Sequence, residues 1–460
     1  MTNYRDVSYW LESAGDDLTP RPALPESIDV DVAILGAGYS GLWTAYYLKE
    51  RDPSLEIAII EREIAGFGAS GRNGAWCTSE FPTGPGALAH TYGDDTARAV
   101  VTAMRETVTE IKRVTKAEGI ACDWADGGQL LIARGPHQRP AIDDEYQTLS
   151  RLRLADGLEL LDADQARARV NVTELTGGLF SPYTAVIHPG KLVRGLARAV
   201  EGRGVRIYEQ TAVTRVHPGR YPTLETDRGN VRAKAIVLCG EAYLSQVPGY
   251  GRAVMPVYSL ITLTEPLSEA DWAEIGWRNR ECVASCRYTV DYLSRTADGR
   301  ILFGGRGAPY RFGSKITPEM DKHAGTHQLL QDNVRAWFPR LKDVRFTHTW
   351  GGPLGWSRDF MPTVSFDKRQ GLGMAHGYTG NGVATTNLAG RTLAAMITGQ
   401  QSDLLHLPHA NHTTRPWEPE PFRYLGVRFV QQSFMRIDRQ AEATGIAPSG
   451  TSLAERLTAH

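Results

Sequence analysis

The sequence predicts a two-lobed α/β fold of the α+β kind, in which a βαβ unit is followed by a mixed, largely antiparallel sheet. Residues 29–60 show the βαβ pattern, because a glycine-rich loop joins one apolar strand to a helix and a second strand. Residues 257–305 alternate between apolar and polar positions, which is typical of antiparallel strands. The length of 460 residues exceeds the usual size of one hydrophobic core, so two lobes are expected.

The elements of the first lobe follow in chain order. Residues 29–35 and 55–60 are short apolar strands, and helix formers occupy residues 42–49 between them. Asp94 is expected to cap a helix that ends near Gly119, because charged residues alternate there with Val, Met and Ile at helical spacing.

The middle of the chain combines strand signals with one amphipathic helix. Residues 129–133 are predicted to be a strand, and His188 and Pro189 open a helix over 192–199, which together suggest a second βαβ-like passage. Turn residues then separate three strand signals, which predict a small antiparallel meander. These signals are residues 213–217, 223–226 and 231–239.

The last part of the chain begins with the alternating segment 257–305, which is expected to form the floor of a ligand pocket. Residues 317–338 are predicted to be helical, and residues 382–398 form a helix of small residues directly after a glycine-rich loop. Residues 422–443 form an amphipathic tail. Its polar face carries charges of both signs, which favours packing on the protein itself over binding to a membrane or partner.

Composition excludes several classes of partner. The 51 basic and 52 acidic residues give a net charge of −1, so no long-range field favours nucleic acid or anionic lipid. No apolar run approaches the roughly 18 residues of a membrane span and no secretory leader pattern is visible, so a cytoplasmic protein is expected. The 5 cysteines are odd in number, fit reduced thiols and form no zinc-ligand set.

Gly36, Gly38 and Gly41 form a GxGxxG loop between the first strand and the first helix, and Glu61 ends the second strand. The first glycine permits a tight turn, the second allows a pyrophosphate to approach, and the third lets the helix pack on the strand. The helix N-terminus supplies N–H donors for the phosphates. An acid at Glu61 suits a ribose and disfavours the 2′-phosphate of NADP, so the pattern predicts a dinucleotide and leaves FAD and NAD open.

Two further glycine-rich loops favour a flavin. Residues 66–76 follow the ribose acid and offer backbone donors and small side chains to a ligand longer than the ADP half of NAD. Residues 376–383 lead into the helix of small residues, and the N-terminus of that helix can stabilise negative charge on a reduced flavin ring.

With these loops in place, the chain resembles the FAD-dependent amine and amino-acid oxidoreductases of the D-amino-acid oxidase, glycine oxidase and sarcosine oxidase superfamily. Within it, the chain is most similar to the gamma-glutamylputrescine oxidase-like branch. The resemblance runs from about Ser8 to Asp438. Its most specific pieces are AILGAGYSGLWTAYYL, GFGASGRNGA, VRAKAIVLCGEAY, RYTVDYLSRTADGRILFGG, and WGGPLGWSRDFMP followed by GYTGNGV.

The resemblance implies a Rossmann-type FAD-binding domain interleaved with the mixed substrate-domain sheet. It implies that FAD contacts the glycine loop and Glu61, that a backbone group near Val213 touches the adenine, and that residues 377–382 face the flavin. The expected cofactor-binding residues are Gly36, Ala37, Gly38, Tyr39, Ser40, Gly41, Glu61, Arg62, Gly68, Ala69, Ser70, Arg72, Asn73, Gly74, Ala75, Trp76, Val213, Gly240, Gly352, Gly377, Tyr378, Thr379, Gly380, Asn381, Gly382 and Val383.

The predicted domains are discontinuous. The chain begins and ends with extensions, residues 1–27 and 401–460. The FAD-binding domain comprises residues 28–120, 189–250 and 356–400, and the substrate domain comprises residues 121–188 and 251–355.

Three positions depart from the family pattern. Glycine and D-amino-acid oxidases resemble each other around a WxGLRP-like segment whose Arg clamps a substrate carboxylate, and Leu354 stands at the matching position here. An amine whose polar end is held elsewhere is therefore favoured over an α-amino acid. Asn381 stands where His is common, and it carries no charge. Cys286 is similar in place to the cysteine that tethers FAD in sarcosine oxidases, but an ordinary strand cysteine is favoured, so non-covalent FAD is expected.

Aromatic and polar side chains near these motifs are candidates for substrate contact. Arg306 lies between glycines and is expected to meet an acidic substrate tail, the alternative being a solvated surface cation. His376 precedes the flavin loop and is a candidate contact, although a single His is more often structural. Ring faces attract ammonium groups, although aromatic residues on alternating strands are often core residues. The aromatic candidates are Tyr258, Tyr288, Tyr292 and Trp350.

The leading hypothesis is an FAD-dependent oxidase that converts a small primary or secondary amine to an imine, which hydrolyses to an aldehyde or ketone. The expected partners are the amine and O₂, and no metal is expected. Such chemistry needs a neutral amine, a C–H bond near the flavin and a water-poor pocket. A dehydrogenase that uses another electron acceptor is the nearest alternative. A flavin-binding protein without turnover is the alternative from another class.

Overall fold

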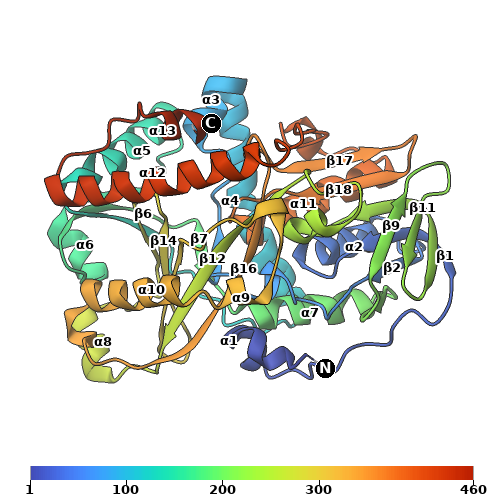
Figure 1. The fold of residues 1–460 in the computed structure, drawn as a ribbon, viewed down its shortest axis with the longest axis horizontal. Helices are drawn as coiled ribbons and strands as arrows, with labels where there is room; N and C mark the ends of the chain where they lie inside the picture. Colours follow the sequence, from blue (N-terminus) through green and yellow to red (C-terminus); the bar gives the residue numbers. More distant parts are fainter. Residues whose placement is uncertain (1, 459–460) are drawn as a thin grey trace.

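The computed structural model describes residues 2–458 and shows two lobes side by side (Figure 1). In the described residues, each lobe is built on one eight-stranded sheet, and a separate two-stranded sheet pairs β3 (Trp76–Thr78) with β7 (Thr184–Val186). This architecture confirms the predicted two-lobed α/β fold class. The domain boundaries stay a prediction, and residues 1 and 459–460 of the two predicted extensions lie outside the described residues.

The sheet of the first lobe has the strand order β17-β18-β11-β1-β2-β8. Its central strand β1 pairs in parallel with β2 and β11, as a βαβ unit requires. Strand β10 pairs antiparallel with β11, and β9 pairs antiparallel with β10, which confirms the predicted meander. The strands are β1 (Ile28–Leu35), β2 (Ile57–Ile60), β8 (Arg206–Tyr208), β9 (Val213–His217), β10 (Thr223–Thr226), β11 (Gly229–Leu238), β17 (Thr363–Asp367) and β18 (Leu372–His376).

The sheet of the second lobe has the strand order β16-β12-β15-β14-β13-β4-β6-β5. Only β13 and β4 pair in parallel, so the sheet is mixed and largely antiparallel, as predicted. The β14–β15 pair forms the expected hairpin. The strands are β4 (Gln129–Arg134), β5 (Glu159–Leu161), β6 (Leu175–Ser181), β12 (Met255–Thr264), β13 (Cys282–Ser285), β14 (Asp291–Arg295), β15 (Ile301–Arg306) and β16 (Phe346–Trp356).

Helices cover both sheets. In the first lobe, α2 and α11 pack against each other through small residues, because a Cβ on Gly390 would lie 2.8 Å from Trp43 Cβ. The helices are α1 (Tyr9–Glu12), α2 (Tyr39–Arg51), α3 (Pro85–Tyr92), α4 (Asp94–Ala117), α5 (Arg139–Arg151), α6 (Ala163–Arg169), α7 (Pro189–Glu201), α8 (Glu269–Ile275), α9 (Pro318–Asp321), α10 (Ala324–Trp337), α11 (Gly382–Thr398), α12 (Phe422–Thr444) and α13 (Leu453–Thr458).

Three local predictions are wrong in detail. Gly93, with φ of 87°, is the N-cap of α4. Asp94 is the first helical residue, where its negative charge interacts favourably with the helix dipole. The helix predicted over 317–338 is broken, because His323 caps α10 by accepting a hydrogen bond from the Thr326 N–H. The passage around α7 is not one βαβ unit, since β4 belongs to the second sheet and β8 to the first.

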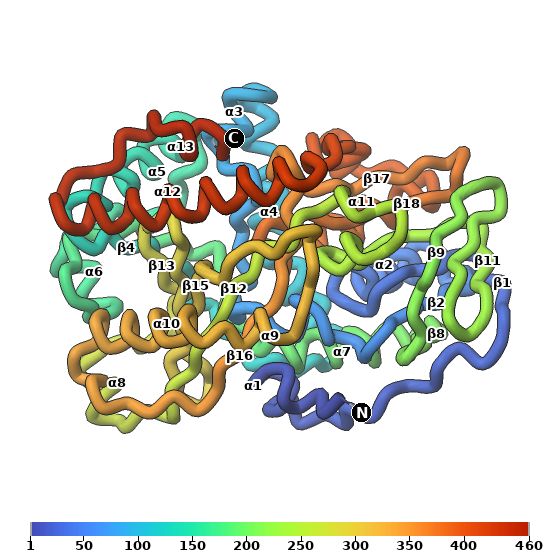
Figure 2. Tube along the Cα trace, in the orientation of Figure 1, coloured from blue at the N-terminus to red at the C-terminus, as the bar shows by residue number. Residues whose placement is uncertain are grey.

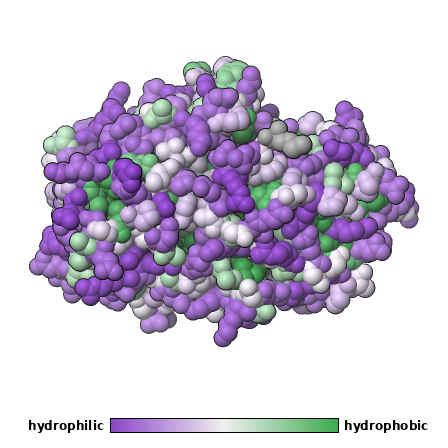
Figure 3. Space-filling view, turned by 90° about the horizontal axis from the view of Figure 1, so that it is seen from below, coloured by the Kyte–Doolittle hydropathy of each residue, from purple (hydrophilic) through white to green (hydrophobic). Residues whose placement is uncertain are grey.

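The C-terminal segment crosses the second lobe on its outside. Figure 2 shows α12 in red running along this lobe before the chain turns back through α13. No described helix is both long and apolar enough to cross a membrane. On the face shown in Figure 3 the surface is mainly hydrophilic, and its hydrophobic patches are small and separate.

Candidate active site

The loop between β1 and α2 fits a dinucleotide. Gly36 has φ of 99°, and a Cβ there would lie 2.7 Å from the Cys239 carbonyl oxygen. A Cβ on Gly41 would lie 2.0 Å from the Gly36 carbonyl oxygen, so the close packing of helix on loop requires glycine. Gly38 is the N-cap of α2 and makes no side-chain cap, which leaves the first N–H groups of the helix available to phosphate oxygens.

Glu61 lies at the end of β2 beside this loop, as predicted. Its Oε2 accepts a hydrogen bond from the Ala37 N–H at 2.8 Å, and its Oε1 accepts one from the Glu63 N–H at 2.9 Å. Burial raises the pKa of Glu61 to about 6. The carboxylate therefore ties the end of β2 to the glycine loop and stands where a ribose acceptor is needed.

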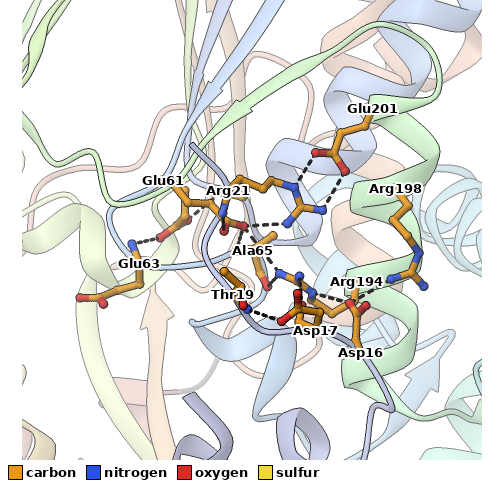
Figure 4. A network of polar contacts seen from close by, with 12 residues as sticks. Asp16, Asp17, Thr19, Arg21, Glu61, Glu63, Ala65, Arg194, Arg198 and Glu201 are labelled. Atoms are coloured by element: carbon orange, nitrogen blue, oxygen red, sulfur yellow. Dashed lines mark hydrogen bonds and ion pairs between the residues drawn. The ribbon is translucent and has the colours of Figure 1, made fainter. Parts of the chain in front are cut away.

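The N-terminal segment holds the loop that follows Glu61 (Figure 4). Arg21 pairs with Glu201 of α7 at 2.5 Å and with the fully buried Glu209 at 2.8 Å. Glu209 also accepts a hydrogen bond from the Ala65 N–H at 2.8 Å. Breaking this ion pair would leave a buried carboxylate without a compensating charge. The pair therefore holds the N-terminal segment against this loop.

A cleft of about 210 Å³ runs from this loop toward the second lobe. Its walls include Val213 at the predicted adenine end and Leu354 at the predicted flavin end. The structure brings most predicted cofactor residues to this cleft. Those on its wall are Gly36, Gly38, Tyr39, Ser40, Glu61, Arg62, Gly68, Ala69, Ser70, Asn73, Val213, Gly240, Tyr378, Gly380, Gly382 and Val383.

A second cavity of about 270 Å³, named here the inner cavity, lies between the flavin end of the cleft and the second sheet. Ala69, Asn73, Leu354, Gly380 and Val383 line both spaces, so the two are continuous. The remaining predicted cofactor residues on its wall are Arg72, Gly74, Trp76, Gly352 and Asn381.

Five predicted cofactor residues lie behind these walls. Two of them have clear structural tasks: Ala37 binds Glu61 through its N–H, and Gly377 packs so closely that a Cβ would lie 1.8 Å from Ser357 Oγ. The described cleft and cavity walls do not include Ala37, Gly41, Ala75, Gly377 or Thr379.

Tyr292 of β14 forms part of the inner cavity floor. Its ring lies between two glycines, because a Cβ on Gly74 would lie 2.4 Å from it and a Cβ on Gly304 would lie 2.1 Å from it. Its hydroxyl lies 2.8 Å from Ser259 Oγ. The two glycines therefore allow one aromatic face to contact both the cofactor loop and the sheet.

Arg306 ends β15 and lines the inner cavity, and its predicted contact with substrate stays a prediction. Its Nη2 donates to the Thr379 carbonyl oxygen at 3.3 Å, and its guanidinium lies 4.7 Å from the centroid of the Trp356 ring. Among the residues that the structure describes, no carboxylate pairs with it, and burial lowers the pKa of Arg306 to about 10. A buried guanidinium without an acid is suited to an anionic group of a ligand.

The wall of the inner cavity also carries acids that the sequence did not predict. Glu80 lines the cavity and remains open to it, and desolvation by the surrounding protein raises the pKa of its carboxyl. Gln129 of β4 donates to Glu80 at 2.5 Å. Asp291 is buried, with a raised pKa, and accepts hydrogen bonds from the N–H and Oγ of Ser285, both at 2.9 Å. These two acids come from separate segments and reach the same cavity only through the fold, and no local signal marks them.

Four predicted substrate contacts lie outside the cleft and the inner cavity. Tyr258 is buried in the second-lobe core, where its hydroxyl accepts a hydrogen bond from the Thr317 N–H at 3.1 Å. Trp350 is buried and donates to the Arg72 carbonyl oxygen at 2.9 Å. His376 is buried at the end of β18, and burial lowers its pKa to about 4, which keeps the ring neutral. Tyr288 contacts the C-terminal segment, donating to Glu455 at 2.7 Å.

Two further residues bear on the flavin loop. Glu241 accepts hydrogen bonds from the Gly355 N–H at 2.9 Å and the Gly377 N–H at 2.8 Å, so it joins the ends of β16 and β18. Burial raises the pKa of Glu241 to about 7.

Cys286 packs among apolar side chains of β4 and α5 and is absent from the described cavity walls, and burial raises the pKa of its thiol to about 12. Both properties oppose a covalent flavin link at Cys286.

Comparison with known proteins agrees with this geometry. The chain is 33% identical over 412 residues to the gamma-glutamylputrescine oxidoreductase of Escherichia coli (strain K12), covering 87% of this chain and 92% of that protein. Two solved structures share the fold. L-proline dehydrogenase from P. horikoshii matches with a TM-score of 0.65 and 20% identity, over 84% of this chain and 96% of that chain. Glycine oxidase from Geobacillus kaustophilus matches with a TM-score of 0.63 and 21% identity, over 84% of this chain and 98% of that chain.

The family model described as FAD dependent oxidoreductase matches residues 31–396. This range includes the glycine loop, both cavity walls and the helix after the flavin loop. The predicted resemblance, the FAD cofactor and the oxidoreductase class are confirmed. The chain therefore belongs to the family of FAD-dependent oxidoreductases.

Proposed function

We propose that the enzyme oxidises the C–N bond of a small primary or secondary amine that carries an anionic or carbonyl group. The amine loses two electrons and two protons to become an imine, and water hydrolyses the imine to an aldehyde or ketone. When bound, FAD supplies the two-electron acceptor, and O₂ then takes the electrons and becomes hydrogen peroxide.

The half-buried Arg306 on the inner cavity, which no described acid pairs with, carries this proposal. Desolvating a guanidinium is costly unless an anion or a strong acceptor completes its hydrogen bonds, so a substrate carboxylate is a suitable partner. Leu354 occupies the shared wall of cleft and cavity and offers no such group. The anionic end is therefore held by Arg306, away from the position that the WxGLRP-like pattern would use.

The rest of the cavity suits the amine itself. Tyr292 lines this cavity, and an aromatic ring beside an ammonium group attracts it by about 0.5–2 kcal/mol. Glu80 also lines the cavity, and its raised pKa makes it a better proton acceptor for the ammonium group than an ordinary carboxylate. The E. coli relative is named for an amine and glycine oxidase for an amino acid, and both names support this substrate class.

Two further proposals concern the cellular compartment and the electron acceptor. The five described cysteines are all free, which supports a reducing compartment such as the cytoplasm. O₂ is proposed as the acceptor, with a dehydrogenase reaction as the measurable alternative.

An anaerobic amine panel tests the proposal. Amines with a carboxylate or amide should bleach the flavin absorbance, and mixing the reduced enzyme with O₂ should restore it with one peroxide per turnover. Rapid bleaching with slow reaction toward O₂ would instead identify a dehydrogenase. Failure of every amine to bleach the flavin would leave a flavin-binding protein without this activity.

A further inference from the structure

A third cavity, named here the outer cavity, lies beneath helix α12 and has a volume of about 700 Å³. Its walls are mainly apolar, and they come from β12, β16, the segment around Trp417, and one face of α12. The apolar residues on the wall include Met255, Val257, Trp356, Trp417, Val427, Val430 and Phe434.

Helix α12 spans this cavity as a strap that is fixed near its ends. It has 23 residues, of which only Arg423, Asp438 and Ala441 are buried. Near its start, Arg423 donates to the Gly251 carbonyl oxygen at 3.2 Å. Near its end, Asp438 accepts hydrogen bonds from the N–H groups of Tyr288 at 3.0 Å and Thr289 at 2.9 Å. The helix is thus held at both ends, while Val430 and Phe434 of its middle turns line the cavity.

The outer and inner cavities meet at Arg306, which lines both of them. Trp356, which stacks on the Arg306 guanidinium, also belongs to the outer wall. The inner cavity of about 270 Å³ is slightly smaller than the range of about 300–1,000 Å³ that is usual for ligand sites. A ligand anchored at Arg306 can therefore extend in two directions, toward the flavin end of the cleft and under α12.

The cations on the outer cavity wall other than Arg306 bind partners on the protein. Arg358 pairs with Glu418 at 3.0 Å, and Arg423 pairs with Glu420 at 3.2 Å, so both cations are compensated. Arg428 donates to Gln431 on the same helix at 3.1 Å. Beyond Arg306 the walls offer mainly hydrocarbon and aromatic contact, which favours an apolar group over a second charged one.

We infer that the outer cavity is a subsite for an apolar tail of the substrate. The substrate class is an amine whose carboxylate or carbonyl group binds at Arg306 and bears an alkyl, acyl or aryl extension that lies under α12. The site for the reacting amine rests on the proposed function, whereas the tail subsite is a binding property that can be measured without turnover.

Unsubstituted alkanoates, from acetate to octanoate, are suitable probes because they have a carboxylate for Arg306, a variable tail and no amine. Isothermal titration calorimetry with the FAD-loaded enzyme should show Kd falling about fourfold for each added methylene, since each buried CH₂ contributes about 0.8 kcal/mol. The binding heat capacity should become more negative with tail length.

Val430→Trp places an indole into the outer cavity and should abolish the gain with tail length while leaving the Kd of acetate unchanged. Val427→Trp, one turn earlier on the same wall, is a second variant in case the first fails to fold. Phe429→Trp is the matched control, because Phe429 is 43% exposed and lies outside this wall. It should retain the full length dependence.

A Kd independent of tail length, or a length dependence that survives both cavity-filling variants, would overturn the inference. A wild-type dimer that dissociates in Val430→Trp, seen by analytical ultracentrifugation, would also overturn it by showing that a second copy fills the cavity. The proposed function fails separately: it fails if no amine bleaches the flavin, even where octanoate binds as expected.

Discussion

Replacing Arg306 by Met is the sharpest test of the active site. The substitution keeps an unbranched stem against Trp356 and removes the guanidinium, which lies 4.7 Å from that ring. Burial lowers the pKa of Arg306 to about 10, which corresponds to roughly 3 kcal/mol against the charged form in the free enzyme. No described acid compensates for the desolvation of the Arg306 guanidinium. Arg306→Met should therefore fold with an unchanged or higher melting temperature.

Substrate binding should respond in the opposite direction. A hydrogen bond to a charged group contributes about 1.5–3 kcal/mol, so kcat/KM for a carboxylate-bearing amine should fall about 10- to 150-fold. An uncharged amine of equal length should lose little. Arg306→Lys keeps the charge without the planar guanidinium. Its kcat/KM for the carboxylate-bearing amine should therefore lie between those of wild type and Arg306→Met.

The assay is peroxide formation at saturating O₂, with thermal melting measured on the same samples. A structural arginine gives the contrast: Arg72 pairs with Asp321 at 2.6 Å, so Arg72→Met should lower the melting temperature. If Arg306→Met melts as early as Arg72→Met, or impairs charged and uncharged amines equally, then Arg306 is a structural residue and the reasoning is refuted.

Three further predictions concern the cofactor and the cavity floor. Gly304→Ala places a Cβ 2.1 Å from the Tyr292 ring and should cost about 1–3 kcal/mol and reduce kcat/KM, whereas Gly84→Ala, whose Cβ meets nothing within 4 Å, should leave turnover unchanged. Since the pKa of Glu61 is about 6, its ionised acceptor is lost as pH falls through that value, so the Kd of FAD measured by fluorescence should rise below it; a Glu61→Gln variant with the same pH profile would contradict this. Acid precipitation should leave the yellow colour in the supernatant for wild type and for Cys286→Ser alike, and colour that stays with the wild-type pellet would show a tether.

Local patterns were sufficient to predict the dinucleotide loop. The Gly36, Gly38 and Gly41 spacing, the apolar strands on either side and Glu61 all lie within one short stretch, and their geometry follows from steric requirements of the backbone. The start of α7 was predictable for the same reason, because His188 caps the helix by accepting from the Lys191 N–H and Pro189 suits its first turn.

The substrate side depended on which face of each strand meets the cavity. Tyr258 and Ser259 are neighbours on β12, yet Ser259 lines the inner cavity and Tyr258 enters the core. Side chains alternate along a strand, so a shift of one residue in pairing register exchanges the two faces. This is why Tyr292 and Arg306 line the cavity among the candidates, whereas Trp350 does not.

Residue order and periodicity thus specify the glycine loop, the meander and the β14–β15 hairpin of this protein, because those features arise from forces between near neighbours in the chain. The presence of Glu80 and Arg306 on one cavity wall, and the space beneath α12, come from segments far apart in sequence. Only the packing of the two lobes and the C-terminal strap brings them together, since burial and charge compensation act through distance in space rather than along the chain.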